Sequence, residues 1–173
     1  GMSHAEVVAL EEAGSERRGA TMFVTLEPCA HPGRTGPCAD AIIQSGVSKV
    51  VTPMRDPNPL VSGKGIQKLI EAGVEVVIDG AHTEEAEKLN EPFVHFMRTG
   101  LPLVTVKSAV TLDGKIAAPQ NNDGWITSET ARAHVQQLRH QADVILTGIG
   151  TVLNDDCLLT DRSGQQRSRP LLR

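Results

Sequence analysis

The chain has 173 residues, 39% of them hydrophobic and 22% charged, which suits a globular protein with room for one complete domain but not comfortably for two. Its formal net charge of -4 comes from interspersed acidic and basic residues and its aromatic content is 2%, so charge and stacking capacity both argue against a nucleic-acid partner. No apolar stretch is long enough to cross a bilayer and no signal-peptide pattern opens the chain, so we expect a cytoplasmic protein without a membrane partner.

Helix-like segments alternate with short runs rich in β-branched residues, which predicts an α/β fold with a mostly parallel sheet. In chain order, we expect a helix over residues 4–13, a strand over 22–26, a helix over 37–44, a strand over 49–52, a helix over 65–71 and a strand over 74–78. An acid-rich helix then begins at Thr83 and runs toward Met97. The helix-breaking residues 99–102 follow, and we place a domain boundary there.

A second, shorter α/β series follows this boundary. Its expected elements are a strand over residues 103–109, a turn at Asp113-Gly114, a helix over 128–141 and a strand over 144–147. These are too few for an independent nucleotide-binding domain. We therefore expect one domain over residues 1–100 and an incomplete second domain over 101–173.

The strongest chemical signal is His4-Ala5-Glu6, followed by Thr25-Leu26-Glu27-Pro28-Cys29 and Gly36-Pro37-Cys38. Three cysteines do not make a disulfide framework, so metal binding or catalysis is their more natural use. One imidazole and two thiolates, from His4, Cys29 and Cys38, suit tetrahedral Zn²⁺ with the fourth position left for a water whose pKa the metal lowers. Glu6 shares the first helical turn with His4 and is the expected proton shuttle.

Each of these residues has a plainer interpretation when it is taken alone. His4 would be a surface residue, and the cysteines would be small buried hydrophobic side chains. Their combination with Glu6 and the Pro28-Cys29 pair instead predicts a zinc deaminase site. Cys157 is not part of such a motif and is expected to be a thiol of the core or of a sheet edge.

The spacing of the two cysteines points to one group of deaminases. Base, nucleoside and tRNA deaminases usually carry P-C-x-x-C, whereas residues 30–37 separate the cysteines here. The run E-P-C-A-H-P-G-R-T-G-P-C closely resembles the deaminase half of the bifunctional pyrimidine deaminase–reductase family of riboflavin biosynthesis. In that family, the extra His31 and Arg34 would suit a substrate that carries a ribosyl phosphate.

The resemblance extends over nearly the whole chain. Residues 56–59 and 63–65 are similar to the loop on the substrate side of the family's deaminase, although alone they are only a turn rich in proline and glycine. Residues 107–117, 125–128 and 147–156 are similar to the opening of the family's reductase. The fold that this implies is a cytidine-deaminase-like α/β/α sandwich followed by the start of a dihydrofolate-reductase-like α/β domain.

Site residues of the reductase half follow from the resemblance by position. It implies NADPH contacts at Ala109, Trp125, Thr151 and Asp155, and substrate contacts at Asp123, Arg139, Leu159 and Arg162. The two arginines suit a sugar phosphate, because a guanidinium holds phosphate oxygens bidentately, and Lys107 would lie near the sugar. Taken alone, Arg139 would be an exposed helix charge. Asp123 stands where the family commonly has a small hydroxyl residue, and Thr111 stands where it frequently has serine.

The activity that the resemblance implies has two steps. The first is zinc-dependent hydrolytic deamination of 2,5-diamino-6-(5-phosphoribosylamino)pyrimidin-4-one, and the second is NADPH reduction of the ribosyl to a ribityl chain. Family members have several dozen residues before the His-Ala-Glu motif, so we expect a protein truncated at both ends, with weak deaminase activity, no reductase activity and self-association into a homo-oligomer. The alternatives are a nucleoside, base or tRNA deaminase and an inactive zinc-binding module.

Overall fold

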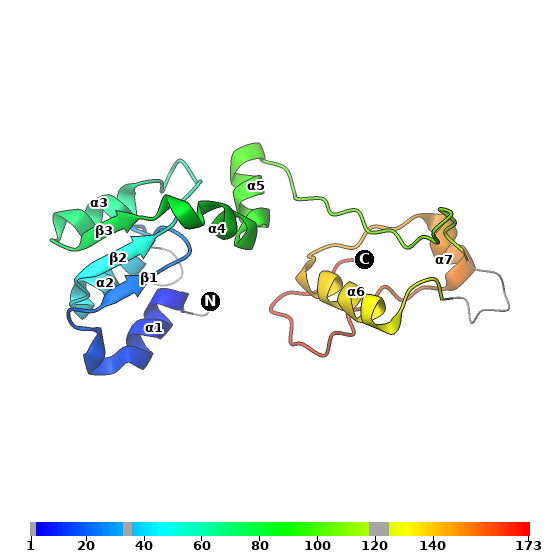
Figure 1. Cartoon of the computed structure of the whole chain (residues 1–173), viewed down its shortest axis with the longest axis horizontal. Helices are drawn as coiled ribbons and strands as arrows, with labels where there is room; N and C mark the ends of the chain where they lie inside the picture. The colour runs from blue at the N-terminus through cyan, green and yellow to red at the C-terminus, as the bar shows by residue number, and fades with distance from the viewer. Residues whose placement is uncertain (1–2, 33–35, 118–124) are drawn as a thin grey trace. The chain divides into compact units, whose positions relative to one another are not determined.

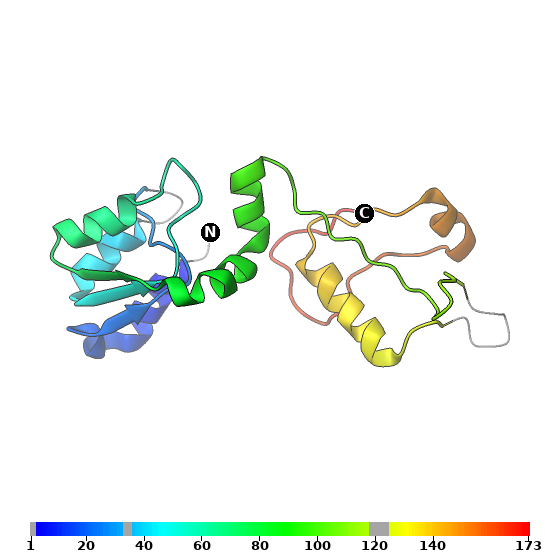
Figure 2. The same ribbon diagram turned by 45° about the horizontal axis from the view of Figure 1, so that its top comes forward.

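The computed structural model describes residues 3–32, 36–117 and 125–173. The chain divides into two compact units, unit 1 over Gly1–Thr105 and unit 2 over Val106–Arg173 (Figures 1 and 2). Two residues that the sequence analysis singled out, Arg34 and Asp123, lie outside the described residues. Within the described part of the chain, none of the helices is both long and apolar enough to cross a membrane.

Unit 1 alternates helices and strands as the sequence predicts. Its elements are α1 (Ala5–Ala13), the 3₁₀ turn η1 (Gly14–Arg17), β1 (Thr21–Phe23), α2 (Cys38–Ser45), β2 (Lys49–Thr52), α3 (Lys64–Glu71), β3 (Glu75–Ile78), the 3₁₀ turn η2 (Gly80–His82), α4 (Thr83–Leu89) and α5 (Glu91–Thr99). The strands form one parallel sheet in the order β1-β2-β3, with Met22 opposite Val50 and Val50 opposite Val76. The predicted α/β class with a parallel sheet is therefore confirmed.

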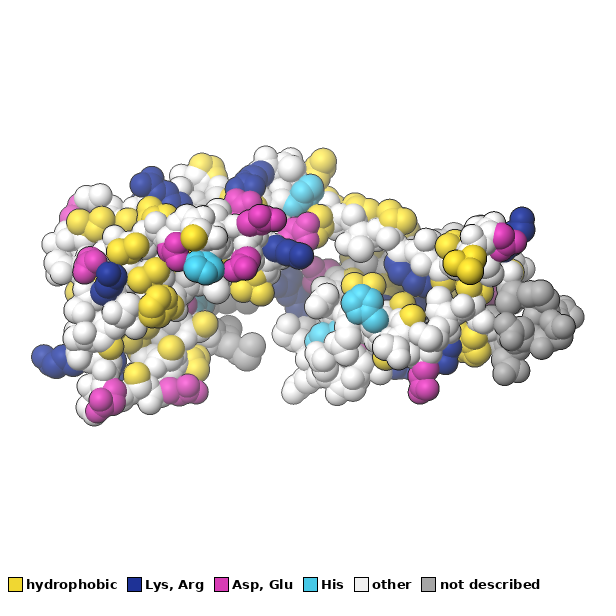
Figure 3. All heavy atoms as spheres, viewed as in Figure 1, with side chains coloured by type: hydrophobic (Ala, Val, Ile, Leu, Met, Phe, Trp, Pro, Cys, Tyr) yellow, Lys and Arg dark blue, Asp and Glu magenta, His cyan; other side chains and the backbone are white. Residues whose placement is uncertain are grey.

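The main core of unit 1 lies between the sheet and the first three helices. Leu10 of α1, Ile42 of α2 and Leu69 of α3 pack with Val50 of β2, and the last three side chains are fully buried. The opposite face of the sheet carries Phe23, whose side chain is 77% exposed, and hydrophobic side chains gather over these strands in Figure 3. The helices thus bury one face of the sheet and bring the N-termini of α1, α2 and α3 to its carboxyl-end side.

The single helix predicted from Thr83 toward Met97 is wrong, because the chain forms two helices that meet at Asn90. Pro92 stands in the first turn of α5. Proline has no N–H to donate to the carbonyl four residues before it, and its ring clashes with that carbonyl, so α4 cannot continue through this point. Ala86 of α4 and Val94 of α5 then pack against Met54 in a second small core beside the sheet.

Unit 2 is built around two helices, α6 (Glu129–Gln141) and α7 (Ile149–Asp155). The predicted helix over 128–141 is confirmed, with the Ser128 hydroxyl accepting the Ala131 N–H at 3.2 Å as an N-cap. The turn at Asp113-Gly114 is also confirmed, since Gly114 donates to the Thr111 carbonyl at 2.9 Å with a φ of 80°.

The strands predicted over 103–109 and 144–147 are wrong for the described residues. Residues 103–109 form no ladder with the part of the chain that the structure describes, and Val144 makes only an isolated parallel bridge with Leu172. A β-branched run favours extended backbone, but a strand also needs a neighbour to pair its N–H and C=O groups. Arg167 holds the C-terminal end of α6, because its guanidinium donates to the carbonyls of Arg139 at 2.8 Å and Ala142 at 2.7 Å.

Candidate metal centre and a second pocket

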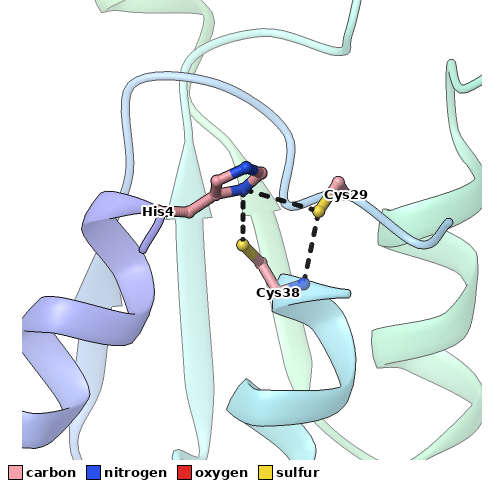
Figure 4. Close-up of side chains that lie close together, drawn as sticks. All are labelled: His4, Cys29 and Cys38. Carbon is pink, nitrogen blue, oxygen red and sulfur yellow. Dashed lines mark hydrogen bonds between the residues drawn. The ribbon is translucent and has the colours of Figure 1, made fainter. Parts of the chain in front are cut away.

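The three predicted metal ligands lie together at the ends of α1 and α2 (Figure 4). His4 is the N-cap of α1, Cys38 is the first residue of α2, and Cys29 lies in the loop that follows β1. The Nδ1 atom of His4 is 3.1 Å from Sγ of Cys38 and 3.7 Å from Sγ of Cys29, and all three ligand atoms lie within 4.8 Å of one another. Residues distant in sequence thus present one nitrogen and two sulfurs to a common point.

Local helix geometry explains this convergence. The His4 carbonyl accepts the N–H groups of Val7 and Val8, so the imidazole leaves the chain where α1 begins. The first N–H groups of α2 bind the other cysteine, because Cys38 N donates to Cys29 Sγ at 3.3 Å and Ala39 N donates to the Cys29 carbonyl at 3.0 Å. A helix N-terminus with free N–H groups favours a thiolate beside it.

The donor set fits Zn²⁺. Tetrahedral zinc, with bonds of about 2.3 Å to sulfur and about 2.1 Å to nitrogen, separates its ligand atoms by about 3.6 Å. The distance of 3.7 Å from His4 Nδ1 to Cys29 Sγ matches this value, and the distance of 3.1 Å to Cys38 Sγ is shorter. Cys38 is fully buried whereas His4 is exposed, so the cluster is closed on the protein side and open on the other. That asymmetry matches a catalytic site, which keeps one coordination position for a water or a substrate.

The electrostatics of the cluster also call for a cation. Burial raises the pKa of the Cys38 thiol, and the negative charge of Glu6 and the neighbouring Cys29 raise it further. Two thiolates and a carboxylate repel one another at this range unless a cation lies among them. The half-buried Glu6, two residues after His4, is thus close enough to Cys38 to act on its pKa.

A buried carboxylate, Glu27, lies two residues before Cys29 in the chain and was not among the site residues predicted from the sequence. Its side chain is 3% exposed and accepts four backbone N–H groups from residues 56–66. No local pattern reveals such a role, because every one of these donors is at least 29 residues away in the sequence.

The loop similar to the family's substrate-side loop lies against Glu27. Burial raises the pKa of Asp56, and the N–H that Asn58 donates to its Oδ1 at 2.8 Å opposes the shift. The charge of Glu27 raises the pKa of Asp56 further, and the charge of the exposed His31 lowers it.

Unit 2 contains a cavity of about 640 Å³ on one side of α6. Its lining includes three residues expected to contact NADPH, namely Ala109, Trp125 and Asp155, and three expected near the substrate, namely Lys107, Arg139 and Arg162. The two other described residues of the predicted set do not line it. Thr151 lies exposed on α7, and Leu159 is half-buried with a φ of 52°.

The cavity is rich in positive charge. Arg132 joins Lys107, Arg139 and Arg162 in its lining, against the two acidic residues Glu129 and Asp155. The Arg132 guanidinium stacks 4.5 Å from the centre of the Trp125 ring and donates to the Thr127 carbonyl at 2.6 Å. Arg132 was not among the residues predicted from the sequence, although a spacing of seven residues puts it on the same face of α6 as Arg139.

Two family models match separate parts of the chain. The cytidine and deoxycytidylate deaminase zinc-binding region matches residues 1–54, which include the whole metal cluster. The RibD C-terminal domain matches residues 102–172, which include the cavity of unit 2.

Curated relatives match both parts at once. The riboflavin biosynthesis protein RibD of Bacillus amyloliquefaciens is 51% identical over 99% of this chain and 46% of its own length. RibD of Escherichia coli K12 is 51% identical over 94% of this chain and 44% of its own length. The chain thus spans about half the length of the relatives that it matches.

Solved structures agree with the curated relatives. RibD of Acinetobacter baumannii superposes with a TM-score of 0.84 at 50% identity, covering 94% of this chain and 45% of that one. A diaminohydroxyphosphoribosylaminopyrimidine deaminase/5-amino-6-(5-phosphoribosylamino)uracil reductase of Thermotoga maritima superposes with a TM-score of 0.86 at 43% identity, covering 99% of this chain and 49% of that one. With relatives this similar along nearly its whole length, the chain belongs to the RibD family of riboflavin biosynthesis proteins.

Proposed function

We propose that this chain is a zinc-dependent deaminase of 2,5-diamino-6-(5-phosphoribosylamino)pyrimidin-4-one. The observation that carries the proposal is the convergence of His4, Cys29 and Cys38 beside Glu6. The similar Thermotoga maritima protein has a deaminase of this substrate class in its name. In this proposal residues 1–100 form the deaminase domain, and residues 101–173 form the first part of an NADPH-dependent reductase domain.

The metal-binding residues and Glu6 have different roles in the proposed reaction. His4, Cys29 and Cys38 would hold the Zn²⁺ ion, which supplies a Lewis acid able to lower the pKa of a water molecule to near neutrality. Glu6 transfers protons from the attacking water to the ring nitrogen and to the departing amine. A carbon–oxygen bond forms at the ring carbon as its bond to the amino nitrogen breaks, so the products are the deaminated pyrimidine and ammonia.

The positive cavity of unit 2 binds the substrate phosphate and NADPH in this proposal. Arg139 and Arg162, with Lys107 beside them, bind the phosphate of the substrate, because guanidinium groups pair with phosphate oxygens bidentately. Ala109, Trp125 and Asp155 contact NADPH in this proposal. Thr151 completes the NADPH set, and Asp123 and Leu159 complete the substrate set, as the resemblance implies.

Release of ammonia by the zinc-loaded chain tests the proposed deaminase. We expect turnover of the diaminopyrimidine ribosyl phosphate and a loss of about 10²- to 10⁴-fold in Glu6→Gln, since that variant lacks the general acid–base group. Glu11→Gln, an exposed change on the same helix, should behave as the unchanged chain does. Stoichiometric zinc without ammonia would favour the inactive zinc-binding module, and faster turnover of cytidine or guanine would favour a nucleoside or base deaminase.

A further inference from the structure

The Glu27 carboxylate is buried, two residues before the metal-binding Cys29, and no step of the proposed chemistry uses it. Its Oε2 atom accepts the backbone N–H groups of Asp56 at 3.0 Å and Gly63 at 2.9 Å. Its Oε1 atom accepts those of Gly65 at 2.9 Å and Ile66 at 3.2 Å. A buried carboxylate is costly unless its oxygens are hydrogen-bonded, and here each oxygen has two donors. The side chain is therefore held in one position by two stretches of backbone.

Three of these donors belong to the start of α3. Gly63 is the N-cap of that helix and offers no side-chain cap. The Lys64 N–H is accepted locally by the Val61 carbonyl at 2.9 Å, which leaves the N–H groups of Gly65 and Ile66 to an acceptor from elsewhere. Glu27 supplies the missing acceptor from a segment 36 residues or more away in the sequence. Its negative charge also lies at the positive end of the helix dipole. Glu27 thus joins the loop after β1 to α3.

The residue that follows Glu27 makes this junction tight. Pro28 is fully buried, and its carbonyl oxygen lies so close to Gly65 that a Cβ added there would come within 1.8 Å of it. On the other side, Cys29 is held by the two N–H groups at the start of α2. The segment that carries the cysteine is therefore clamped between the N-termini of α3 and α2, with Glu27 as the anchor on the α3 side.

We propose that Glu27 is a positioning residue that keeps Cys29 in the metal-binding set. This inference rests on the proposed function, since it concerns the same three-ligand zinc site. In Glu27→Gln, one oxygen becomes an NH₂ group that cannot accept a hydrogen bond, so two backbone N–H groups lose their acceptor and face a donor instead. Relief of that clash moves Pro28 away from α3 and takes the Cys29 sulfur out of reach of His4 Nδ1.

Metal titration of the metal-free chain tests this positioning role. We expect Glu27→Gln to lower zinc affinity by about 10- to 100-fold, the usual effect of losing a residue that orients a ligand. With Co²⁺ as a spectroscopic probe, the thiolate charge-transfer absorbance per bound ion should fall from that of two thiolates to that of one. Glu71→Gln, an exposed change in α3, is the matched control and should leave both measurements unchanged. Glu27→Asp keeps the charge on a shorter side chain and should recover part of the zinc affinity.

The outcomes separate this inference from the proposed function. If Glu27→Gln binds Co²⁺ with the absorbance of two thiolates, Glu27 does not position Cys29, even if the variant unfolds more easily. Should Glu27→Gln fail to fold, the milder Glu27→Asp carries the test, and an unchanged zinc affinity and two-thiolate absorbance there would overturn the inference. If the unchanged chain binds neither metal through thiolates, the proposed deaminase site itself fails.

Discussion

At Gly65 the absence of a side chain lets two segments of the chain pack closely. Its position against the Pro28 carbonyl leaves no room for a methyl group, whereas nothing lies within 4 Å of the corresponding position at Gly80. Only glycine lets α3 approach the segment that carries Cys29 closely enough for Glu27 to reach the helix start.

We therefore predict that Gly65→Ala lowers the free energy of unfolding of the chain by about 1–3 kcal/mol, the usual cost of forcing extra volume into a packed site. Gly80→Ala is the matched control and should stay within about 0.5 kcal/mol, as a change at an open surface position does. Urea unfolding followed by circular dichroism measures both. Equal stabilities for the two variants would contradict the close contact at Pro28.

Among the elements of unit 2, α6 and the segment after residue 160 depend on one carboxylate. Asp161 accepts the Ser163 N–H at 2.8 Å on Oδ1, and Oδ2 lies 2.9 Å from Nδ1 of His140. The Ser163 N–H, and then the His140 side chain, lower the pKa of Asp161 below its ordinary value. Arg167 adds a charge 3.6 Å from the same carboxylate while it holds the end of α6.

The sign of the resulting pH dependence follows from this lowered pKa. Stabilisation by Asp161 is fully present above the pKa of an unfolded aspartate, about 3.9, and is lost as the pH falls through the lower folded pKa. We predict that unit 2 loses stability below about pH 4 and that Asp161→Asn flattens this loss. Asp143→Asn, in an exposed pair with Arg169, is the control and should keep the pH dependence. Fluorescence of Trp125 during urea unfolding, recorded from about pH 2 to 7 across that window, measures it.

At the scale of the whole molecule, the chain contains one tryptophan and no tyrosine, so its fluorescence reports on unit 2 alone. Trp125 lines the positive cavity of that unit beneath Arg132. Bound NADPH would contact Trp125 and place an anionic phosphate near Arg132, the cavity arginine that the proposal does not assign to the substrate. A ligand of this cavity should therefore change the emission directly, without any added label.

We predict that NADPH quenches the fluorescence of Trp125 saturably. In Arg132→Ala the affinity for NADPH should fall by about tenfold or more, the scale expected for losing one charged hydrogen-bond donor. Arg169→Ala removes an exposed arginine of the same unit and serves as the control. Binding should also weaken as salt is added, since screening acts on the charges of the cavity. An emission spectrum that NADPH leaves unchanged would argue against a cofactor site here.

Self-association and a cytoplasmic location stay predictions.

Local sequence patterns were enough to predict the metal ligands and the fold class of this protein. The donor atoms of the metal cluster, the helix starts that present them and the parallel α/β class all follow from motifs and periodicities that involve only neighbouring residues. Pro92 divides α4 from α5 by equally local chemistry, and that signal was overlooked. The tertiary structure alone decided the anchoring of Glu27 and the closeness of Gly65 to Pro28. It also decided that residues 103–109 form no ladder with the described residues. A buried carboxylate and an extended segment depend on hydrogen-bond partners far away in the chain, and no spacing in a sequence specifies which distant backbone will supply them.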